Sequence, residues 1–213
     1  MENCYIYIVL TRTNTTISRL IRLFTHDDYT HAAIALDKNM EKMYSFARKR
    51  TYNPFVGRFK QENLNEGIYK LCRELPGVIM EIEVPVEKYE EAVKLLDEFI
   101  TNSNRYKYNY LGLFYALLNK PVQFENRFLC SEFVYYILKE SGIADFDMPR
   151  NLVRPQSLLN NLECKIIYQG DLHKLAKSDQ DLISQRMENT NRLRMMHTAI
   201  KRTVSRLAEM VTR

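Results

Sequence analysis

The sequence predicts an α+β fold in which an antiparallel sheet packs against helices. Segments rich in β-branched and aromatic residues predict strands at residues 4–11, 29–36, 42–48, 78–86 and 164–168. Segments with apolar residues three or four positions apart predict helices at residues 17–24, 87–101, 110–118, 128–141 and 156–162. The strands at residues 29–36 and 42–48 are separated by a short turn and predict a hairpin, whereas residues 53–57 contain Pro and Gly and predict a loop.

Length and charge divide the chain into two parts. Its 213 residues suffice for one domain with an apolar core and an appendage. Residues 177–213 contain eight Lys or Arg and four Asp or Glu, a net charge of +4, which leaves +1 for the remainder. We therefore predict a globular domain over residues 1–176 and a basic tail over residues 177–213. The nearly neutral domain lacks the basic surface of a nucleic-acid-binding protein, and no nucleic-acid partner is expected.

The cysteines and the first residues indicate a reducing compartment. Four cysteines are scattered along the chain without a CxxC pair, so neither a structural zinc site nor a disulfide framework is expected. Residues 1–10 lack a basic segment followed by a long apolar run, and no segment is long enough to span a membrane. A cytoplasmic location is the expectation that follows.

Cys130 is the first candidate for chemistry. It lies at or just inside the start of the helix that ends before Gly142, with Ser131 as a residue able to cap and Glu132 in the first turn. Backbone N–H groups and the helix dipole favour a thiolate at that position, as a nucleophile requires. The alternative is that Cys130 is simply a small buried hydrophobic residue.

His31 is the candidate base, because a cysteine nucleophile most often works with a histidine. On the strand of residues 29–36, His31 shares a face with Ala33 and Ala35, so a helix could pack closely there and bring a thiol to the imidazole. The alternative is a histidine at a strand edge held by a backbone carbonyl.

Residues 26–31 contain four possible metal ligands, His26, Asp27, Asp28 and His31. These residues straddle a helix end and a strand, so their side chains diverge, and no further cluster of ligands appears. No metal and no other cofactor is expected.

The segments around the two candidates resemble a known superfamily. Tyr29-Thr30-His31-Ala32-Ala33-Ile34-Ala35-Leu36 precedes Phe128-Leu129-Cys130-Ser131-Glu132-Phe133-Val134. This order resembles the circularly permuted branch of the NlpC/P60 papain-like superfamily, in pattern most like the YiiX/YaeF-like hydrolases and more distantly the lecithin:retinol acyltransferase-like proteins. The resemblance extends over residues 1–168. It implies a papain-like antiparallel sheet with the cysteine helix packed against it, Cys130 as nucleophile and His31 as base.

The resemblance also implies a third, polar residue on the strand that follows the histidine strand. The matching position is Ser45 if the hairpin loop has three residues, because Ser45 then faces Ala33; with a two-residue loop Tyr44 takes that face. Neither is a carboxylate, so Ser45 would orient His31 but would stabilise the imidazolium less well.

Two functions therefore stand against each other. The first is a thiol hydrolase or acyltransferase, whose substrates the resemblance implies to be amides of peptides or peptidoglycan fragments and lipid esters or amides. Its pocket could be lined by Tyr44 and by the run of Tyr106, Tyr108 and Tyr110, although such aromatic runs are often core. The second is a non-catalytic binding or interaction module on the same fold, favoured by the missing carboxylate and the basic tail.

The tail predicts one long amphipathic helix from Leu182 onward. Its apolar positions recur mostly at spacings of three and four, with basic residues between them and no Gly or Pro after Gly170. An isolated amphipathic helix is marginal in water, so its apolar side needs a cover. A second copy of the chain or a protein partner is preferred; the domain itself and an anionic membrane surface are the alternatives, the latter weakened by the lack of an aromatic residue after Tyr168.

Overall fold

A six-stranded antiparallel sheet forms the centre of the protein, in the computed structural model, which describes residues 3–13, 16–50 and 53–175. The strand order is β4-β3-β2-β1-β5-β8. The strands are β1 (Asn3–Thr11), β2 (His31–Ala35), β3 (Met43–Arg50), β4 (Asn53–Glu62), β5 (Pro76–Pro85) and β8 (Lys165–Asp171). The predicted α+β class with an antiparallel sheet is confirmed.

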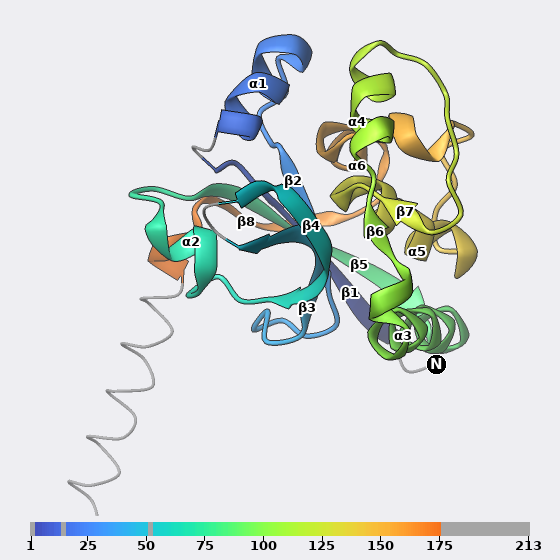
Figure 1. The fold of residues 1–213 in the computed structure, drawn as a ribbon. Coiled ribbons are helices and arrows are strands. Elements are labelled where there is room, and N and C mark those ends of the chain that lie inside the picture. The colour runs from blue at the N-terminus through green and yellow to red at the C-terminus, as the bar shows by residue number, and fades with distance from the viewer. Residues whose placement is uncertain (1–2, 14–15, 51–52, 176–213) are drawn as a thin grey trace, which may run out of the picture. The chain divides into compact units, whose positions relative to one another are not determined.

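Helices pack around this sheet, most of them on the same side of it (Figure 1). They are α1 (Thr16–Thr25), α2 (Gly67–Leu71), α3 (Val86–Thr101), α4 (Tyr110–Leu117), α5 (Cys130–Glu140) and α6 (Pro155–Asn161), with 3₁₀ turns η1 (Ser103–Arg105) and η2 (Arg150–Leu152). A small parallel pair, β6 (Lys107–Tyr108) and β7 (Arg127–Phe128), precedes α4 and α5. Helix α2 lies on the opposite side of the sheet from α3 and α5.

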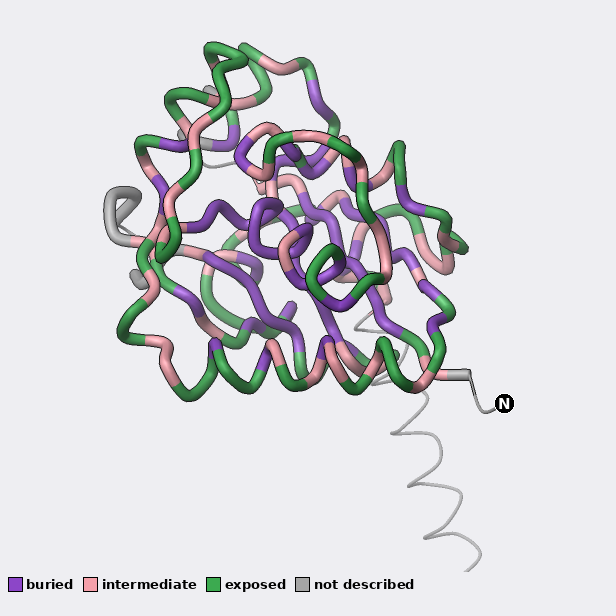
Figure 2. The backbone as a smooth tube through the Cα atoms, turned by 90° about the vertical axis from the view of Figure 1, so that its right-hand side faces the viewer, coloured by how far each residue is buried: buried purple, intermediate pink, exposed green. Residues whose placement is uncertain are grey.

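The core lies between the sheet and helix α5. Alternate residues of β1 point to that side, and Ile6, Ile8 and Leu10 belong to the same buried cluster as Phe133 and Val134 of α5. Buried positions accordingly concentrate around the central helix in Figure 2, while the helix along its lower edge alternates between buried and exposed turns. Residues of α5 are thereby fixed against the middle of the sheet, where the candidate nucleophile lies.

Strand β4 contradicts the prediction of a loop at residues 53–57. Pro54 and Gly57 favour a loop locally, but the segment pairs with β3 from Met43↔Glu62 to Arg50↔Asn53. Gly57 has a packing reason to be in a strand: a Cβ there would lie 2.6 Å from the Tyr108 side chain. Close packing with Tyr108, rather than a turn, accounts for this glycine.

Two other predictions concern membranes and the tail. Within the described residues, no helix is both long enough and apolar enough to cross a membrane. Contacts define a compact unit over Met1–His173. The helix predicted from Leu182 onward, and with it the division at residues 176 and 177, lies outside the described residues.

Candidate active site

Cys130 is the first residue of α5 and is buried. The residue before it, Leu129, donates its backbone N–H to Oε2 of Glu132 at 2.9 Å, so Glu132 closes the first turn of the helix. Ser131 does not cap: it lies inside the helix and its hydroxyl donates to the carbonyl oxygen of Val153 at 2.7 Å. The thiol is therefore held at the helix N-terminus by a carboxylate two residues further along the chain.

Glu132 also joins this turn to its neighbours. The fully buried carboxylate accepts hydrogen bonds from Nδ2 of Asn109 at 3.1 Å and from Nε of Arg150 at 3.0 Å. The Arg150 guanidinium lies over the ring of Phe128, 4.4 Å from its centroid. One carboxylate thus connects the starts of α4, α5 and η2.

His31 begins β2, opposite Thr11 of β1. The helix does not pack on the face that the sequence indicated: Ala32 and Ile34 share the buried cluster of α5, whereas Ala33 and Ala35 are outside it. His31 lies at the end of the strand, and its imidazole hydrogen-bonds to the Cys130 side chain. The structure therefore brings the two candidates together, by a geometry other than the expected one.

Glu62, at the end of β4, is the third member of the group and was missed from the sequence. Its Oε2 lies 2.8 Å from Nε2 of His31, and the hydroxyl of Tyr69 donates to the same oxygen at 3.0 Å. The Glu62 side chain is only 1% exposed. Because Nε2 is bonded to Glu62, the other ring nitrogen, Nδ1, is left for Cys130. A buried carboxylate therefore orients the imidazole.

Ser45 does not contribute to this group. The register Ile34↔Tyr44 places Ser45 opposite Ala33, as the three-residue loop required, but its hydroxyl donates to the carbonyl oxygen of Ala32 at 2.7 Å. The ladder between β2 and β3 pairs only Ile34 and Ala35 with β3, so Ser45 satisfies a buried carbonyl beyond its end. Its role is to hold the strands together.

The pKa values indicate an ion pair. Burial alone would lower the pKa of His31, but the Glu62 carboxylate and Cys130 raise it to about 10. Burial opposes ionisation of the thiol, yet His31 and the backbone N–H groups of Ala32 and Ser131 lower the pKa of Cys130 overall. Burial likewise disfavours the Glu62 carboxylate, and His31 outweighs it, so that the pKa of Glu62 is lowered. The three shifts all favour the charged forms, which are thiolate, imidazolium and carboxylate.

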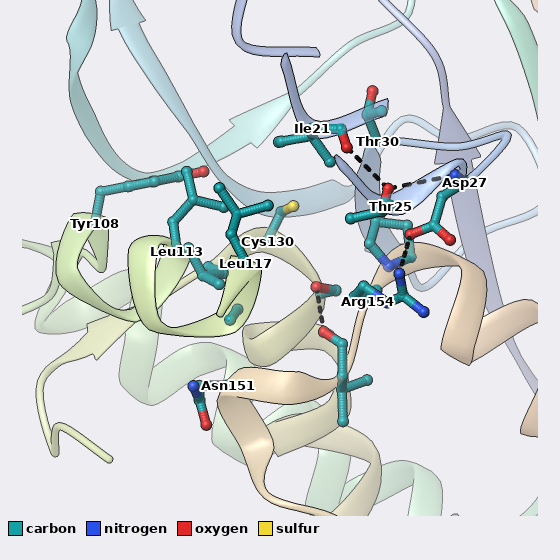
Figure 3. Close-up of a pocket in the computed structure, with 15 residues that line it drawn as sticks. Ile21, Thr25, Asp27, Thr30, Tyr108, Leu113, Leu117, Cys130, Asn151 and Arg154 are labelled. Carbon is teal, nitrogen blue, oxygen red and sulfur yellow. Dashed lines mark hydrogen bonds and ion pairs between the residues drawn. The ribbon is translucent and has the colours of Figure 1, made fainter. Parts of the chain in front are cut away.

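A pocket of about 510 Å³, including its open mouth, extends from Cys130 between α1 and α4. Figure 3 shows the Cys130 side chain with Leu113 and Leu117 of α4 on one side and Thr25 and Thr30 on the other. Most of the surface that lines it is apolar; the aliphatic members are Ile21, Leu113, Ala116, Leu117, Leu129, Val153 and Pro155. Asp27 and Arg154 form an ion pair of 3.3 Å at the side.

The four candidate tyrosines separate into different environments. Tyr108 lines this pocket, and Tyr110 packs against it at a ring separation of 4.7 Å without being part of the lining. Tyr106 stacks on Phe99 at 4.2 Å, and Tyr44 stacks on Phe59 at 6.0 Å. Only Tyr108 is placed to touch a ligand there; Tyr44 and Tyr106 belong to the core cluster or its margin.

Comparison with known proteins shows the fold. No protein-family model matches the chain, and no curated protein does either. Among solved structures, the chain is similar to the metalloprotein YiiX from Escherichia coli O157:H7, of the family DUF1105, with a TM-score of 0.52 and 17% identity over 76% of this chain and 95% of that one. A likeness at this identity concerns architecture alone. The chain therefore shares the fold of YiiX.

Proposed function

We propose that this protein is a cysteine-nucleophile hydrolase or acyltransferase of the permuted, papain-like NlpC/P60 kind that cleaves an ester or amide. The observation that carries the proposal is the hydrogen-bonded series Cys130–His31–Glu62, whose first member lines an apolar pocket. Nucleophile, base and orienting carboxylate are the three parts of a catalytic triad. The missing carboxylate that favoured a non-catalytic module is supplied by Glu62.

The reaction follows from the charges of these groups. The Cys130 thiolate attacks the carbonyl carbon, and the resulting oxyanion is stabilised by the backbone N–H of Cys130 at the start of α5. The bond to the leaving alcohol or amine then breaks as His31 donates its proton to that group, which leaves a thioester on Cys130. Water, or another acceptor, gives a proton back to His31 and attacks the thioester, and the thiolate departs.

Glu62 keeps its negative charge through these steps. It holds the imidazole in the tautomer and orientation that direct Nδ1 to the thiol, and it stabilises the imidazolium that is present before the first proton transfer and formed again by the second. Tyr69 donates to the same oxygen, which fixes the position of the carboxylate. Both residues act on the substrate only through His31.

The pocket favours an apolar acyl group over a charged peptide. Leu113, Ala116 and Leu117 of α4 form one wall beside Cys130, and Ile21 of α1 lies in the same lining. An acyl chain seated there would bury apolar surface worth about 25 cal/mol per Å². Among the substrates that the resemblance implies, a lipid ester or amide is therefore preferred.

A metal does not fit this group. Although YiiX is described as a metalloprotein, no set of three or more His, Cys, Asp or Glu side chains able to hold a metal ion occurs in the part of the chain that the structure describes. The imidazole nitrogens of His31 are already directed to Glu62 and Cys130. No step of the proposed reaction uses a metal.

Trapping the thioester tests the proposal. Full-length protein is incubated with p-nitrophenyl esters from acetate to decanoate, quenched in acid and examined by intact-mass and peptide mass spectrometry. We expect an added acyl mass on Cys130 that increases with chain length, and none in Cys130→Ala; Cys164→Ala is the matched control and should be acylated like the wild type. Absence of an adduct with every ester, together with an inert thiol, would leave the binding module as the better function.

A further inference from the structure

Helix α4 is apolar on both of its sides although one side faces solvent. Leu113, Ala116 and Leu117 point to the pocket. On the other side Leu111, Phe114, Tyr115 and Leu118 follow one another at spacings of three, one and three, and their exposed fractions are 55%, 59%, 37% and 51%. A helix that is hydrophobic all round normally lies within a protein or membrane. The solvent-facing stripe of α4 is therefore an apolar surface that no other described residue covers.

Helix α1 adds to this surface from the other side of the pocket. Leu23 is 70% exposed and Phe24 is 61% exposed, the largest values among the large apolar residues of the described chain. Ile21 and Thr25 of the same helix line the pocket together with residues of α4. Figure 1 shows α1 and α4 projecting at the same end of the molecule. We call the six residues Leu23, Phe24, Leu111, Phe114, Tyr115 and Leu118 the apolar rim.

On the two helices that carry the apolar rim all charged residues are basic, whereas Asp28, just past α1, is an exposed acidic residue. Helix α1 carries Arg19 and Arg22, both exposed, and helix α4 has no charged residue; neither helix contains a carboxylate. Lys120, just past α4, is also exposed. Exposed aliphatic and aromatic side chains next to arginine and lysine are the pattern of elements that lie in a membrane interface, with the apolar side chains among acyl chains and the cations near anionic headgroups.

We propose that the apolar rim docks the protein on the surface of an anionic lipid bilayer, with the pocket facing the membrane. This deepens the proposed function, because a lipid ester or amide would then enter the pocket from the bilayer without crossing water. A protein partner or a second copy could also cover an apolar surface, but neither accounts for the pairing of exposed aromatic side chains with arginines on helices that line an apolar pocket.

Vesicle co-sedimentation of the full-length chain tests the docking. We compare vesicles of phosphatidylcholine alone with vesicles that also contain phosphatidylglycerol, and we expect stronger binding to the second. The double variants Leu23→Ser/Phe24→Ser and Phe114→Ser/Leu118→Ser should each lower the partition coefficient about tenfold or more. Arg19→Gln/Arg22→Gln should remove the preference for the anionic vesicles. Ile100→Ser/Ile166→Ser, which changes two exposed apolar residues of α3 and β8, is the matched control and should bind like the wild type.

Three further measurements separate the outcomes. Circular dichroism should show the same fold in every variant, since the changed side chains are exposed. The tail is present in all variants. If the rim substitutions left vesicle binding unchanged, the binding would be assigned to the tail and the proposal would be overturned. Light scattering without lipid should give the same molar mass for wild type and rim variants; a dimer that the rim substitutions dissociate would instead assign the rim to a second copy.

Failure of docking is distinguishable from failure of the catalytic proposal. Cys130→Ala should bind vesicles like the wild type while it loses hydrolysis. The rim variants should cleave a short, water-soluble p-nitrophenyl ester at the wild-type rate, because none of the substituted residues lines the pocket. A chain that binds vesicles through the rim but forms no acyl adduct would retain the docking and refute the enzyme.

Discussion

Glu62 hydrogen-bonds to His31 across 2.8 Å although the register of the sheet places them apart. Glu62 pairs with Met43, and Met43 pairs with Ala35, which is the opposite end of β2 from His31. The contact therefore depends on the twist of the outer strands, which carries the end of β4 toward the start of β2. A carboxylate from a strand two places away in the sheet thus completes the group around Cys130.

Replacing this carboxylate should impair catalysis more than replacing the residue that the sequence suggested. Glu62→Gln keeps the shape of the side chain but removes the charge that stabilises the imidazolium and fixes its tautomer, so kcat should fall about 100-fold or more. Ser45→Ala removes only the bond to the Ala32 carbonyl and should act mainly on stability, by about 1–3 kcal/mol. Steady-state kinetics measures the loss of kcat, and urea denaturation measures the loss of stability. If Ser45→Ala and Glu62→Gln lowered kcat equally, Ser45 would have a catalytic role.

Cys130 should react as a thiolate well below the pH at which a free cysteine does. Its pKa is lowered by His31 and by two backbone N–H groups, so its alkylation by iodoacetamide should stay fast below the usual thiol pKa of about 8.5. In His31→Gln the imidazolium is lost while burial remains, and the pKa of the thiol should rise above that value. The rate of alkylation against pH measures both, with the change located at Cys130 by peptide mass spectrometry. If the rate of alkylation of the wild type had its midpoint at or above the pKa of a free thiol, the ion pair between Cys130 and His31 would be contradicted.

Removing the thiol should expose how His31 and Glu62 contribute to stability. In Cys130→Ala the imidazole still faces the Glu62 carboxylate, the strongest of the interactions that raise its pKa. We therefore expect the folded protein to hold the His31 proton more tightly than the unfolded chain, in which the pKa of histidine is about 6.5. The stabilisation that protonated His31 gives to the folded state is therefore complete below about pH 6.5, and it is lost as the pH rises through the folded-state pKa of His31. We expect the free energy of unfolding to decline with pH over that interval.

The wild type and a double variant provide the comparison. In the wild type, folding lowers the pKa of Cys130 and raises that of His31, so the two changes in bound protons oppose each other at pH values between the unfolded pKa values of His and Cys. His31→Gln/Cys130→Ala has neither group and should show no decline from this source. Urea denaturation at a series of pH values measures the free energy of unfolding of all three proteins. If that free energy changed with pH equally in the single and double variants, the decline could not be assigned to His31.

Breaking the Glu132 network should cost far more than breaking a surface ion pair. Arg150→Met removes the cation that faces a fully buried carboxylate, and the charge left behind should cost about 3–5 kcal/mol. Lys139→Met removes the partner of Asp145 on the surface and should cost far less, because water screens that pair. Chemical denaturation gives both values. Similar, small losses would show that Glu132 tolerates the loss of its cation.

The residues that the sequence could indicate are those whose placement is local. Cys130 at a helix start and His31 on a strand follow from apolar spacing over a few residues, and the structure brings the two together. The face of β2 that receives α5 was assigned wrongly, because alternation separates two faces without saying which one a helix covers. His31 meets the thiol as the terminal residue of its strand, where alternation no longer constrains the side chain.

Glu62 could not be found in this way. It follows a segment whose Pro54 and Gly57 indicate a loop, and its position depends on a long-range pairing with β3 and on sheet twist. The signal that was available is slight: Phe59 stands between Arg58 and Lys60 shortly before Glu62, and an apolar residue flanked by charged ones is compatible with a half-buried strand. A carboxylate at the end of such a strand, in a chain that lacked one for its histidine, was a candidate worth naming.

The Asn109 side chain gives the site a mechanical property. It accepts from the Gly112 N–H in the first turn of α4 and donates to Glu132 in the first turn of α5, and a Cβ on Gly112 would lie 2.2 Å from its amide nitrogen. The Asn109 amide therefore connects α4, which forms one wall of the pocket, to α5, which carries Cys130. The site is therefore preformed. We expect selectivity among acyl groups to depend on how well each fits a rigid pocket, because binding does not require the pocket to rearrange.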